Sequence, residues 1–324
     1  MLFPLFRRKK KDDLHTIAFY NLENLFDTKD NPNTLDDDFT PEGFKRWSTK
    51  RYKRKLYKLA KTISEIGIES SRTTPVLIGV AEVENRKVVQ DLVSAEPLKE
   101  IDYGIVHYDS PDERGIDTAL VYLKSNFEVL ASEPITLFVD NPNGERDTTR
   151  DILYVYGRLN GEETHIFVNH WPSRRDGEDA TDYKRIEAAK TLIRKMTRIE
   201  KTQTEPNYII MGDFNDGPTS PSIQELMKTG SLYNPMEKLL TPDKGSANYK
   251  GKWMLFDQIL ISHNFLNYEK HTHSFARSDI FSKASLTEFK GKYKGTPYRT
   301  YAGRKYIGGY SDHFPVYIQL KYNS

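Results

Sequence analysis

Apolar residues along the chain gather in short runs, and several of these runs stand directly beside polar residues that can do chemistry. Tyr208–Met211 leads into Gly212–Asn215, and Ser311–Phe314 leads into Pro315–Ile318. Short apolar runs bounded by turn residues are typical of buried strands. On this criterion the predicted strands are Thr16–Asn21, Val76–Val83, Tyr103–Tyr108, Thr118–Leu123, Ile152–Leu159, His165–His170, Tyr208–Phe214, Phe256–Ile261 and Val316–Leu320.

Two segments between these strands repeat their apolar residues with the period of a helix. The first face consists of Tyr52, Leu56, Leu59, Ile63 and Ile66, and the second of Ile186, Ala189, Ile193, Met196 and Ile199. Thr181 and Asp182 are suitable residues for the start of the second helix. Because strands and helices are intermixed without a break, we predict one α/β domain over residues 14–324, with strands from both ends of the chain.

Three segments show neither pattern and are predicted to be loops. Asp27–Trp47 is acidic and contains Pro and Gly, which indicates a solvated surface insertion. Lys244–Lys252 and Lys290–Lys305 are also predicted loops, and the second interleaves basic residues with Tyr and Gly. Such a segment can contact a phosphate backbone and stack on bases, but it can equally be a soluble basic loop.

Composition and charge exclude only a few classes of protein. The 324 residues carry a formal net charge of +2, so any basic surface must be local. Cysteine is absent, which excludes disulfides and thiolate zinc sites. No apolar run has the length of a membrane span. Residues 1–13 place Arg7–Lys11 after an apolar start, the reverse of a signal peptide. We expect a flexible basic arm there, and a cytoplasmic monomer, although secretion remains open.

Polar residues that can act in catalysis or metal binding stand at the ends of the predicted strands. The segments are Tyr20–Asn24, Gly79–Asn85, Arg114–Asp117, Thr149–Asp151, Asn169–Trp171, Gly212–Asn215 and Ser311–His313, and Phe256–Ile259 adds an acid at the start of a run. Alone, each is ordinary, because an Asp or Asn after a strand is more often a turn or a helix cap. Their shared setting indicates a metal-assisted or acid–base site, because carboxylates are rarely buried unpaired.

In this order, the segments from Asn21 to His313 resemble those of the endonuclease/exonuclease/phosphatase family, the DNase-I-like metal-dependent phosphoesterases. The resemblance covers nearly the whole chain after the basic arm. It implies a four-layer α/β sandwich, in which two packed, mostly antiparallel sheets are flanked by helices. It also implies in-line attack of water on a phosphoester without a covalent intermediate, with Mg²⁺ or Mn²⁺ as cofactor and Ca²⁺ able to support binding.

The resemblance gives five residues a role near the metal and the attacking water. Glu82 and Asp312 match metal-binding acids, and Asn21 matches an asparagine that supports the metal site. One or two protein ligands suffice for a hard cation that keeps its waters. Asp213 resembles the aspartate that orients or deprotonates water, and Asn215 would donate its amide to a phosphate oxygen. Residues two apart in an extended chain point the same way, so both are expected to face one phosphate.

The resemblance also implies two histidine–acid pairs and an arginine at the phosphate. His313 resembles the histidine that contacts the scissile phosphate, with Asp257 as its partner. His170 resembles a second phosphate-facing histidine, with Asp117 in the place of its acid. A neighbouring carboxylate favours the charged imidazole, so both histidines are expected to be cationic donors. Arg150 matches an arginine beside the phosphate, and an internal salt bridge is an equally good interpretation of it.

Other residues fit the pattern less well. His170 stands where the branch that cuts at abasic sites carries a tyrosine, so abasic-site repair is disfavoured. Arg174 and Arg175 follow it, and either serve a second phosphate or are simply exposed. Glu84 should point along the same face as Glu82, and whether it is a second metal ligand stays open.

One further histidine pair has the spacing of a metal site. His271 and His273 form a His-x-His motif, which can place two imidazoles on one side of a strand. The sequence shows no partner carboxylate for them. We therefore interpret this pair as structural.

Three interpretations compete with a nuclease. Gly212–Asp216 fits one motif of the binuclear metallophosphatases, but their Gly-Asn-His-Glu/Asp and Gly-His-x-His motifs are absent. A catalytically silent module for nucleic acid or protein should lack the metal glutamate or a catalytic pair, and both are present. An inositol-phosphate or sphingomyelin type phosphoesterase stays open, because substrate choice depends on loops. We predict a phosphodiesterase acting as an endo- or exonuclease on nucleic acid, DNA more than RNA, with a small phosphoester as the alternative.

Overall fold

The computed structural model describes residues 13–174 and 177–324, so the predicted arm lies outside the described residues except for Asp13. It contains two six-stranded sheets. In spatial order, the first sheet consists of β15 (His273–Ile280), β18 (Val316–Tyr322), β1 (Leu14–Leu25), β2 (Leu77–Val83), β4 (Asp117–Leu123) and β3 (Tyr103–His107). The second consists of β11 (Leu232–Tyr233), β14 (Asp257–Ser262), β10 (Tyr208–Asp213), β9 (Glu162–His170), β8 (Ile152–Leu159) and β5 (Phe127–Ile135).

The remaining elements are helices and short ribbons. The helices are α1 (Thr49–Glu65), α2 (Ile68–Ser71), α3 (Arg86–Val93), α4 (Glu178–Glu200) and α5 (Pro221–Met227), with 3-10 turns at Asp37–Phe39, Glu237–Leu239, His263–Leu266 and Ala284–Leu286. The ribbons pair β6 (Val139–Asp140) with β7 (Arg146–Asp147), β12 (Ala247–Tyr249) with β13 (Lys252–Met254), and β16 (Tyr301–Ala302) with β17 (Lys305–Tyr306).

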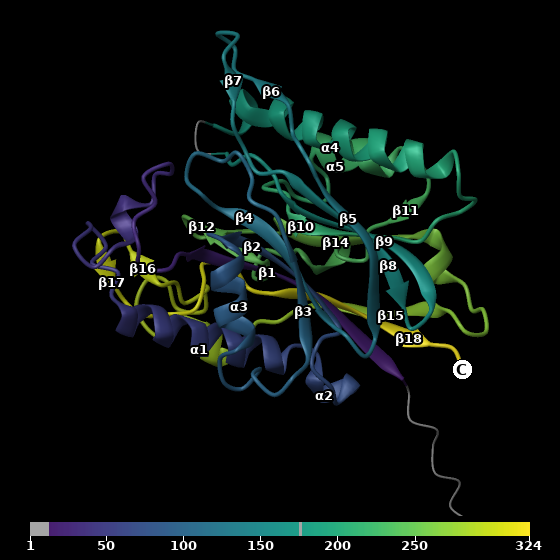
Figure 1. The fold of residues 1–324 in the computed structure, drawn as a ribbon, viewed down its shortest axis with the longest axis horizontal. Coiled ribbons are helices and arrows are strands. Elements are labelled where there is room, and N and C mark those ends of the chain that lie inside the picture. Colours follow the sequence, from purple (N-terminus) through teal and green to yellow (C-terminus); the bar gives the residue numbers. More distant parts are fainter. Residues whose placement is uncertain (1–12, 175–176) are drawn as a thin grey trace, which may run out of the picture.

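The two large sheets lie face to face with helices on both outer sides (Figure 1). α1 and α3 lie on the side of the first sheet, and α4 and α5 on the side of the second. The pairs β1–β2 and β9–β10 are parallel, whereas the other neighbouring strands of the two sheets are antiparallel. The predicted four-layer α/β sandwich is therefore confirmed. Within the described chain, no helix combines the length and the apolar character needed to cross a membrane.

The alternation of side chains along the strands explains how these layers pack against one another. In β10, Ile209 and Met211 pack in the core between the sheets, whereas Ile210 packs on the opposite face with Leu192 of α4. Successive residues of a strand point to opposite faces. A strand buried on both faces therefore appears in the sequence as a continuous apolar run, which is why β10 could be predicted from Tyr208–Met211.

The two main helices lie close to the positions that their apolar periods predict. In α1, Tyr52, Leu56, Leu59 and Ile63 are buried, and the Ser48 hydroxyl caps the first turn. The predicted start of α4 was wrong. This helix begins at Glu178, and the Thr181 hydroxyl donates to the Gly177 carbonyl at 2.7 Å from inside its first turn.

The sequence analysis missed two long strands, β5 and β15, as well as the two-residue β11 and the strands of the three short ribbons. β5 and β15 are the outermost strands of their sheets, and most of their residues are half-buried or exposed. Each also contains a register shift, between Val129 and Ala131 in β5 and between Phe275 and Arg277 in β15. Exposure and bulges disturb the alternation of apolar and polar residues, and this alternation is the sequence signal of a strand.

The predicted surface loop Asp27–Trp47 is only partly solvated. Trp47 is fully buried, and its indole nitrogen donates to the Phe26 carbonyl at 3.0 Å. The ring of Phe39 stacks on that of Phe26 at 4.5 Å, and the ring of Trp47 lies 6.1 Å from that of Tyr301. Aromatic contacts therefore hold this segment against the basic, tyrosine-rich loop near the C-terminus.

A buried histidine cluster joins the two sheets. His15 Nδ1 and His273 Nε2 lie 3.0 Å apart, and His273 Nδ1 lies 2.5 Å from Glu162 Oε2. His273 thus has a carboxylate partner that the sequence did not reveal, whereas His271 is exposed and takes no part. Burial, and then the neighbouring His273, lowers the pKa of His15 to about 4.

The low pKa of His15 makes folding sensitive to acid. An unfolded His15 takes up its proton near pH 6.5, whereas the folded protein resists protonation down to about pH 4. The free energy of unfolding should fall as pH drops through this window, by an amount on the order of 2–3 kcal/mol. Urea unfolding between pH 7 and pH 4 measures it. His15→Gln should flatten the slope, and the exposed control His263→Gln should not; equal slopes in all three proteins would contradict the assignment.

Candidate active site

Three predicted residues form one row across the second sheet. His170 at the end of β9 is in register with Asp213 at the end of β10, which is in register with Asp257 at the start of β14. Asp213 is in phase with Ile209 and Met211, so strand alternation turns it toward the space between the sheets. All three side chains are buried. The row therefore closes one end of the core between the sheets.

The first sheet brings Asn21 and Glu82 to the same place. The Asn21 amide nitrogen lies 3.0 Å from Asp213 Oδ2 and 3.4 Å from Glu82 Oε1, and donates to both. Glu82 has a φ of 61° at a register shift between β2 and β4, and its Oε2 accepts from the backbone nitrogen of Asn24 at 2.8 Å. A left-handed backbone is costly for a glutamate and is concentrated at functional sites. The left-handed backbone of Glu82 lies where β2 contacts the end of β1.

His313 and Asp257 form the predicted pair. His313 Nδ1 lies 2.7 Å from Asp257 Oδ2, and His313 Nε2 lies 3.9 Å from Asp213 Oδ2. Burial disfavours the charged imidazole, but the negative charges of Asp257 and Asp213 outweigh it and raise the pKa of His313 well above its usual value. His313 is therefore a cation at neutral pH, held with Nε2 on the side of Asp213.

His170 has the opposite electrostatic character, and the prediction of a second cationic histidine was wrong. Burial, followed by the positive charges of Arg150 and Arg114, lowers the pKa of His170 well below its usual value. Its Nε2 lies 3.8 Å from Glu82 Oε1 and 3.9 Å from Asp213 Oδ2, so these contacts involve a neutral ring. Among the described residues, nothing hydrogen-bonds to its buried Nδ1.

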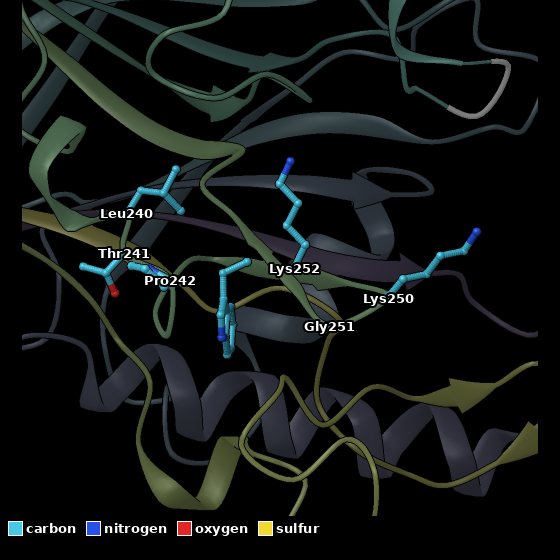
Figure 2. A pocket seen from close by; sticks show the side chains of 7 residues that line it. Leu240, Thr241, Pro242, Lys250, Gly251 and Lys252 are labelled. Atoms are coloured by element: carbon cyan, nitrogen blue, oxygen red, sulfur yellow. The ribbon is translucent and has the colours of Figure 1, made fainter.

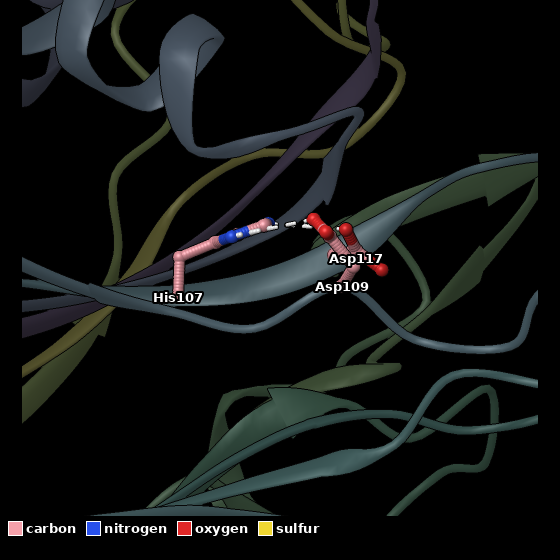
Figure 3. Close-up of side chains that lie close together, drawn as sticks. All are labelled: His107, Asp109 and Asp117. Carbon is pink, nitrogen blue, oxygen red and sulfur yellow. Dashed lines mark hydrogen bonds and ion pairs between the residues drawn. The ribbon is translucent and has the colours of Figure 1, made fainter. Parts of the chain in front are cut away.

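Asp117 does not pair with His170, contrary to the sequence prediction. Asp117 Oδ2 lies 3.0 Å from His107 Nε2, and Oδ1 accepts from the backbone nitrogen and the hydroxyl of Ser110. In the antiparallel pair β3–β4, His107 is opposite Ala119, so Asp117 is its diagonal neighbour. Figure 3 shows this group, in which Asp109 also lies near the imidazole.

Arg150 forms an internal salt bridge, which is the second of the two roles predicted for it. It is buried, and its guanidinium donates to Asp112 Oδ2 at 3.0 Å and to the carbonyls of His170 and Trp171 at 3.1 and 2.6 Å. These bonds hold the chain that leaves β9. Arg150 therefore positions His170 and contributes positive charge from beneath it.

Asn215 does not continue the strand, which corrects the expectation that it would face the same way as Asp213. β10 ends at Asp213, and Asn215 has a φ of 50°. Its backbone nitrogen donates to Asp213 Oδ1 at 2.9 Å, and its side-chain amide donates to the Trp171 carbonyl at 2.9 Å. Asn215 thus folds back over Asp213.

Arg174 and Glu84 also have internal partners. Arg174 donates to the Asn215 carbonyl at 2.6 Å and to Asp216 Oδ1 at 2.5 Å, which braces the turn after β10. Arg175 lies outside the described residues. Glu84 Oε2 accepts from the backbone nitrogen of Asp27 at 2.5 Å, so its carboxylate is turned to that loop and the same-face expectation was wrong.

The sequence analysis missed a cluster of charges beside this centre. Asp312 is ion-paired with Arg299, whose Nε lies 3.9 Å from Glu23 Oε1. Burial and the charge of Asp312 raise the pKa of Glu23 to about 7, despite Lys55 and the Thr300 backbone nitrogen. The left-handed backbone of Glu23 is part of the bulge after Asn21, which no pattern of apolar residues indicates.

Lys55 is a buried cation on helix α1. Its ammonium donates to the Glu23 carbonyl and to the Thr300 hydroxyl, and it is almost completely buried. Burial lowers the pKa of Lys55, while Glu23 and Asp312 act in the opposite direction. On sequence alone Lys55 looks like any basic residue of an amphipathic helix.

The donor atoms suit a hard divalent cation in part. Among the described residues, Glu82 Oε1 accepts only the long 3.4 Å hydrogen bond from Asn21, with His170 Nε2 at 3.8 Å, so it can accept a metal. Asn21 turns its nitrogen toward Glu82 and its oxygen toward the backbone of Glu23, which is the position of a supporting residue. Asp213, Asp257 and His313 form a second group, with ligand atoms within 4.8 Å of one another.

A family profile and the known structures agree with this geometry. The profile described as "Endonuclease/Exonuclease/phosphatase family" matches residues 16–322. The chain therefore belongs to this family, and it is an enzyme that hydrolyses phosphoester bonds. No curated protein matches its sequence significantly.

Three solved structures illustrate the likeness of fold. A Bacteroides thetaiotaomicron protein of this family is 18% identical, with a TM-score of 0.60, and the match covers 96% of this chain and 99% of that one. A mannosyl-6-phosphatase from the same species is 17% identical, with a TM-score of 0.56 and coverage of 95% and 100%. The human Nocturnin catalytic domain, with a bound sulfate anion, is 15% identical, with a TM-score of 0.57 and 96% coverage of both chains.

The buried charge of Asp213 should cost stability. Burial, together with Asp257 and against His313, raises the pKa of Asp213 from 3.8 to about 6. A raised carboxyl pKa means that stability is lost as pH rises from about 4 to about 6. Asp213→Asn should therefore raise the free energy of unfolding at pH 8 by roughly 1–3 kcal/mol, and by much less at pH 4.

Chemical denaturation in chelator at both pH values measures this effect. The matched control is Asp112→Asn, which removes the partner of the buried Arg150 and should destabilise the protein at pH 8. A loss of stability in Asp213→Asn at pH 8 would contradict the electrostatic description of the site.

Proposed function

We propose that this protein is a divalent-metal-dependent phosphodiesterase that cleaves nucleic acid, DNA more than RNA. The observation that carries the proposal is the convergence of Asn21 and Glu82 from one sheet with His170, Asp213 and Asp257 from the other. A buried carboxylate with a raised pKa stands next to a histidine held as a cation. Enzymes separate the pKa values of neighbouring groups in this way to obtain a base and a charged donor at one pH.

The proposed roles follow from these charges. Asp213 would orient the attacking water and accept its proton, because its pKa of about 6 is close to neutral pH. His313, fixed by Asp257, would donate from Nε2 to a phosphoryl oxygen on which charge develops. His170 would act there as a neutral donor. The Asn215 amide has a second N–H, beyond the one given to Trp171, for a phosphate oxygen.

The proposed cofactor is Mg²⁺ or Mn²⁺. Glu82 would hold it, supported by Asn21, with Asp312 as the second candidate ligand. A bound divalent cation would neutralise charge on the phosphate. Glu82 contributes the free carboxylate oxygen, and its bulged backbone keeps this oxygen beside Asn21 and His170.

A small phosphoester is the second candidate substrate. The similarity of fold to a mannosyl-6-phosphatase favours it, because one fold can serve different substrates. Salt dependence separates the two, because each phosphate of a polymer that the protein neutralises releases counterions. Steep loss of DNA binding with salt supports a nuclease. Rapid hydrolysis of mannose 6-phosphate or an inositol phosphate, without DNA cleavage, would instead support a hydrolase of small phosphoesters and contradict the nuclease.

Glu82→Gln should remove most of the activity and leave the fold intact. We expect a loss of about a hundredfold or more on both bis(4-nitrophenyl) phosphate and single-stranded DNA, and a similar loss in excess chelator. Glu84→Gln is the matched control, because Glu84 faces Asp27 and should keep near-normal turnover. Full activity in Glu82→Gln, or in chelator, would refute the metal assignment.

The two histidines should act on one charge. His170→Ala and His313→Ala should each reduce kcat roughly a hundredfold, and the double variant should lose much less than the product of the two effects. His107→Ala is the control, since His107 and not His170 pairs with Asp117. Multiplicative losses would show that the two rings serve separate steps. Normal turnover in His170→Ala would show that His170 takes no part in catalysis.

A further inference from the structure

The base of the hairpin β12–β13 is joined by backbone hydrogen bonds to the segment that contains His313. Ala247 forms an antiparallel bridge with His313, and the backbone nitrogen of Phe314 donates to the Ser246 carbonyl at 2.7 Å. The ring of Trp253 also stacks on that of Phe314 at 6.0 Å. The base of the hairpin is therefore fixed relative to His313, and whatever its tip binds is held at a set distance from that imidazole.

The hairpin tip carries one aromatic ring and two cations. Tyr249 is 63% exposed, and Lys250 and Lys252 are exposed on either side of the Gly251 turn. Figure 2 shows the two lysine side chains extending away from this turn. Both line an open hollow of about 640 Å³.

A second groove lies beside the hairpin. Its volume is about 360 Å³, and Tyr249 lines it together with Tyr293, which is 57% exposed, from the loop after Leu286. Arg299 and Asp312 also line the groove, and Asp312 Oδ1 lies 4.0 Å from His313 Nε2. The groove therefore extends from two exposed tyrosines to Asp312, the residue next to His313.

The chemistry of the groove suits a planar, uncharged group attached to a phosphate. Within the parts of the chain that the structure describes, the rings of Tyr249 and Tyr293 have only lysine cations over them, Lys250 at 5.1 Å and Lys292 at 5.8 Å. Their faces are free of other aromatic rings. Glu288 also lines the groove and would repel a phosphate, while it can accept a hydrogen bond from an amine on a base.

We propose that this groove, hereafter the tyrosine groove, binds an unpaired nucleobase next to the scissile phosphate. The proposal rests on the proposed nuclease function and names the form of its substrate. Interleaved aromatic and basic residues are the usual surface for single-stranded nucleic acid, on which each base stacks and each phosphate meets a cation. A base inside a duplex has both faces covered by its neighbours, so it cannot enter the groove without being unstacked.

The test compares two single strands with the same phosphates. Fluorescein-labelled oligothymidylate of roughly 12 nucleotides and an abasic strand of equal length are titrated with full-length protein in chelator, so that neither is cut. Wild type should bind the base-bearing strand about tenfold more tightly than the abasic strand. Tyr249→Leu/Tyr293→Leu should lose that preference, and the control Tyr268→Leu, 73% exposed and on a different loop, should keep it.

The outcomes separate this proposal from the function on which it rests. Equal affinity of wild type for both strands overturns the tyrosine groove, as does an unchanged preference in the folded double variant. Competition by mannose 6-phosphate, lost in the double variant, would overturn it in favour of a sugar site. Because binding is read in chelator, a failure to hydrolyse DNA with Mg²⁺ refutes the nuclease but leaves the binding result standing.

Discussion

Two sheets that each bury one face against the other impose a strict alternation on their strands, and the centre of the molecule depends on this alternation. Ile209 and Met211 point into the core between the sheets, and Asp213 must point the same way because it is in phase with them. The neighbouring strands deliver His170 and Asp257 beside it in register. The apolar residues that hold the layers together thus also determine where the carboxylates lie.

Burying these charged groups is only tolerable because they are arranged in pairs and networks. Asp257 and Asp213 stabilise the positive charge of His313, whereas burial, followed by the charges of Arg150 and Arg114, keeps His170 neutral. Two imidazoles close to one carboxylate therefore carry different charges at the same pH. The cause lies in their surroundings, because the free side chains are identical.

Positive φ angles mark the residues that the regular sheet could not have placed. Glu82, Glu23, Asn24 and Asn215 all adopt a left-handed backbone, and they surround Asn21 and Asp213. Such conformations are unfavourable for these residues and persist only where surrounding contacts maintain them. The bulges in β1 and β2 are therefore part of the construction of the site, since they bring Glu82 to Asn21.

The loops extend the same principle to the surface. The hairpin β12–β13 is bridged to His313 through Ala247, and the loop that contains Arg299 is ion-paired to Asp312. Segments with no apolar pattern of their own are thus tied to the segment that carries Asp312 and His313 by backbone hydrogen bonds and charges. Substrate choice in this fold depends on such segments.

The sequence by itself determined the central strands and most of the residues at their ends, because a strand buried on both faces is a continuous apolar run. The four-layer sandwich followed only through the family resemblance. The pair His313–Asp257 also followed from sequence, through the family resemblance, and is present. What only tertiary structure decided depends on neighbours distant in the chain. Asp117 joins His107 because β3 is beside β4, and His170 is kept neutral by its burial and then by Arg150. Edge strands, bulges and the Lys55–Glu23 contact have no periodic signal, since each is produced by contacts that form only when the sheets pack.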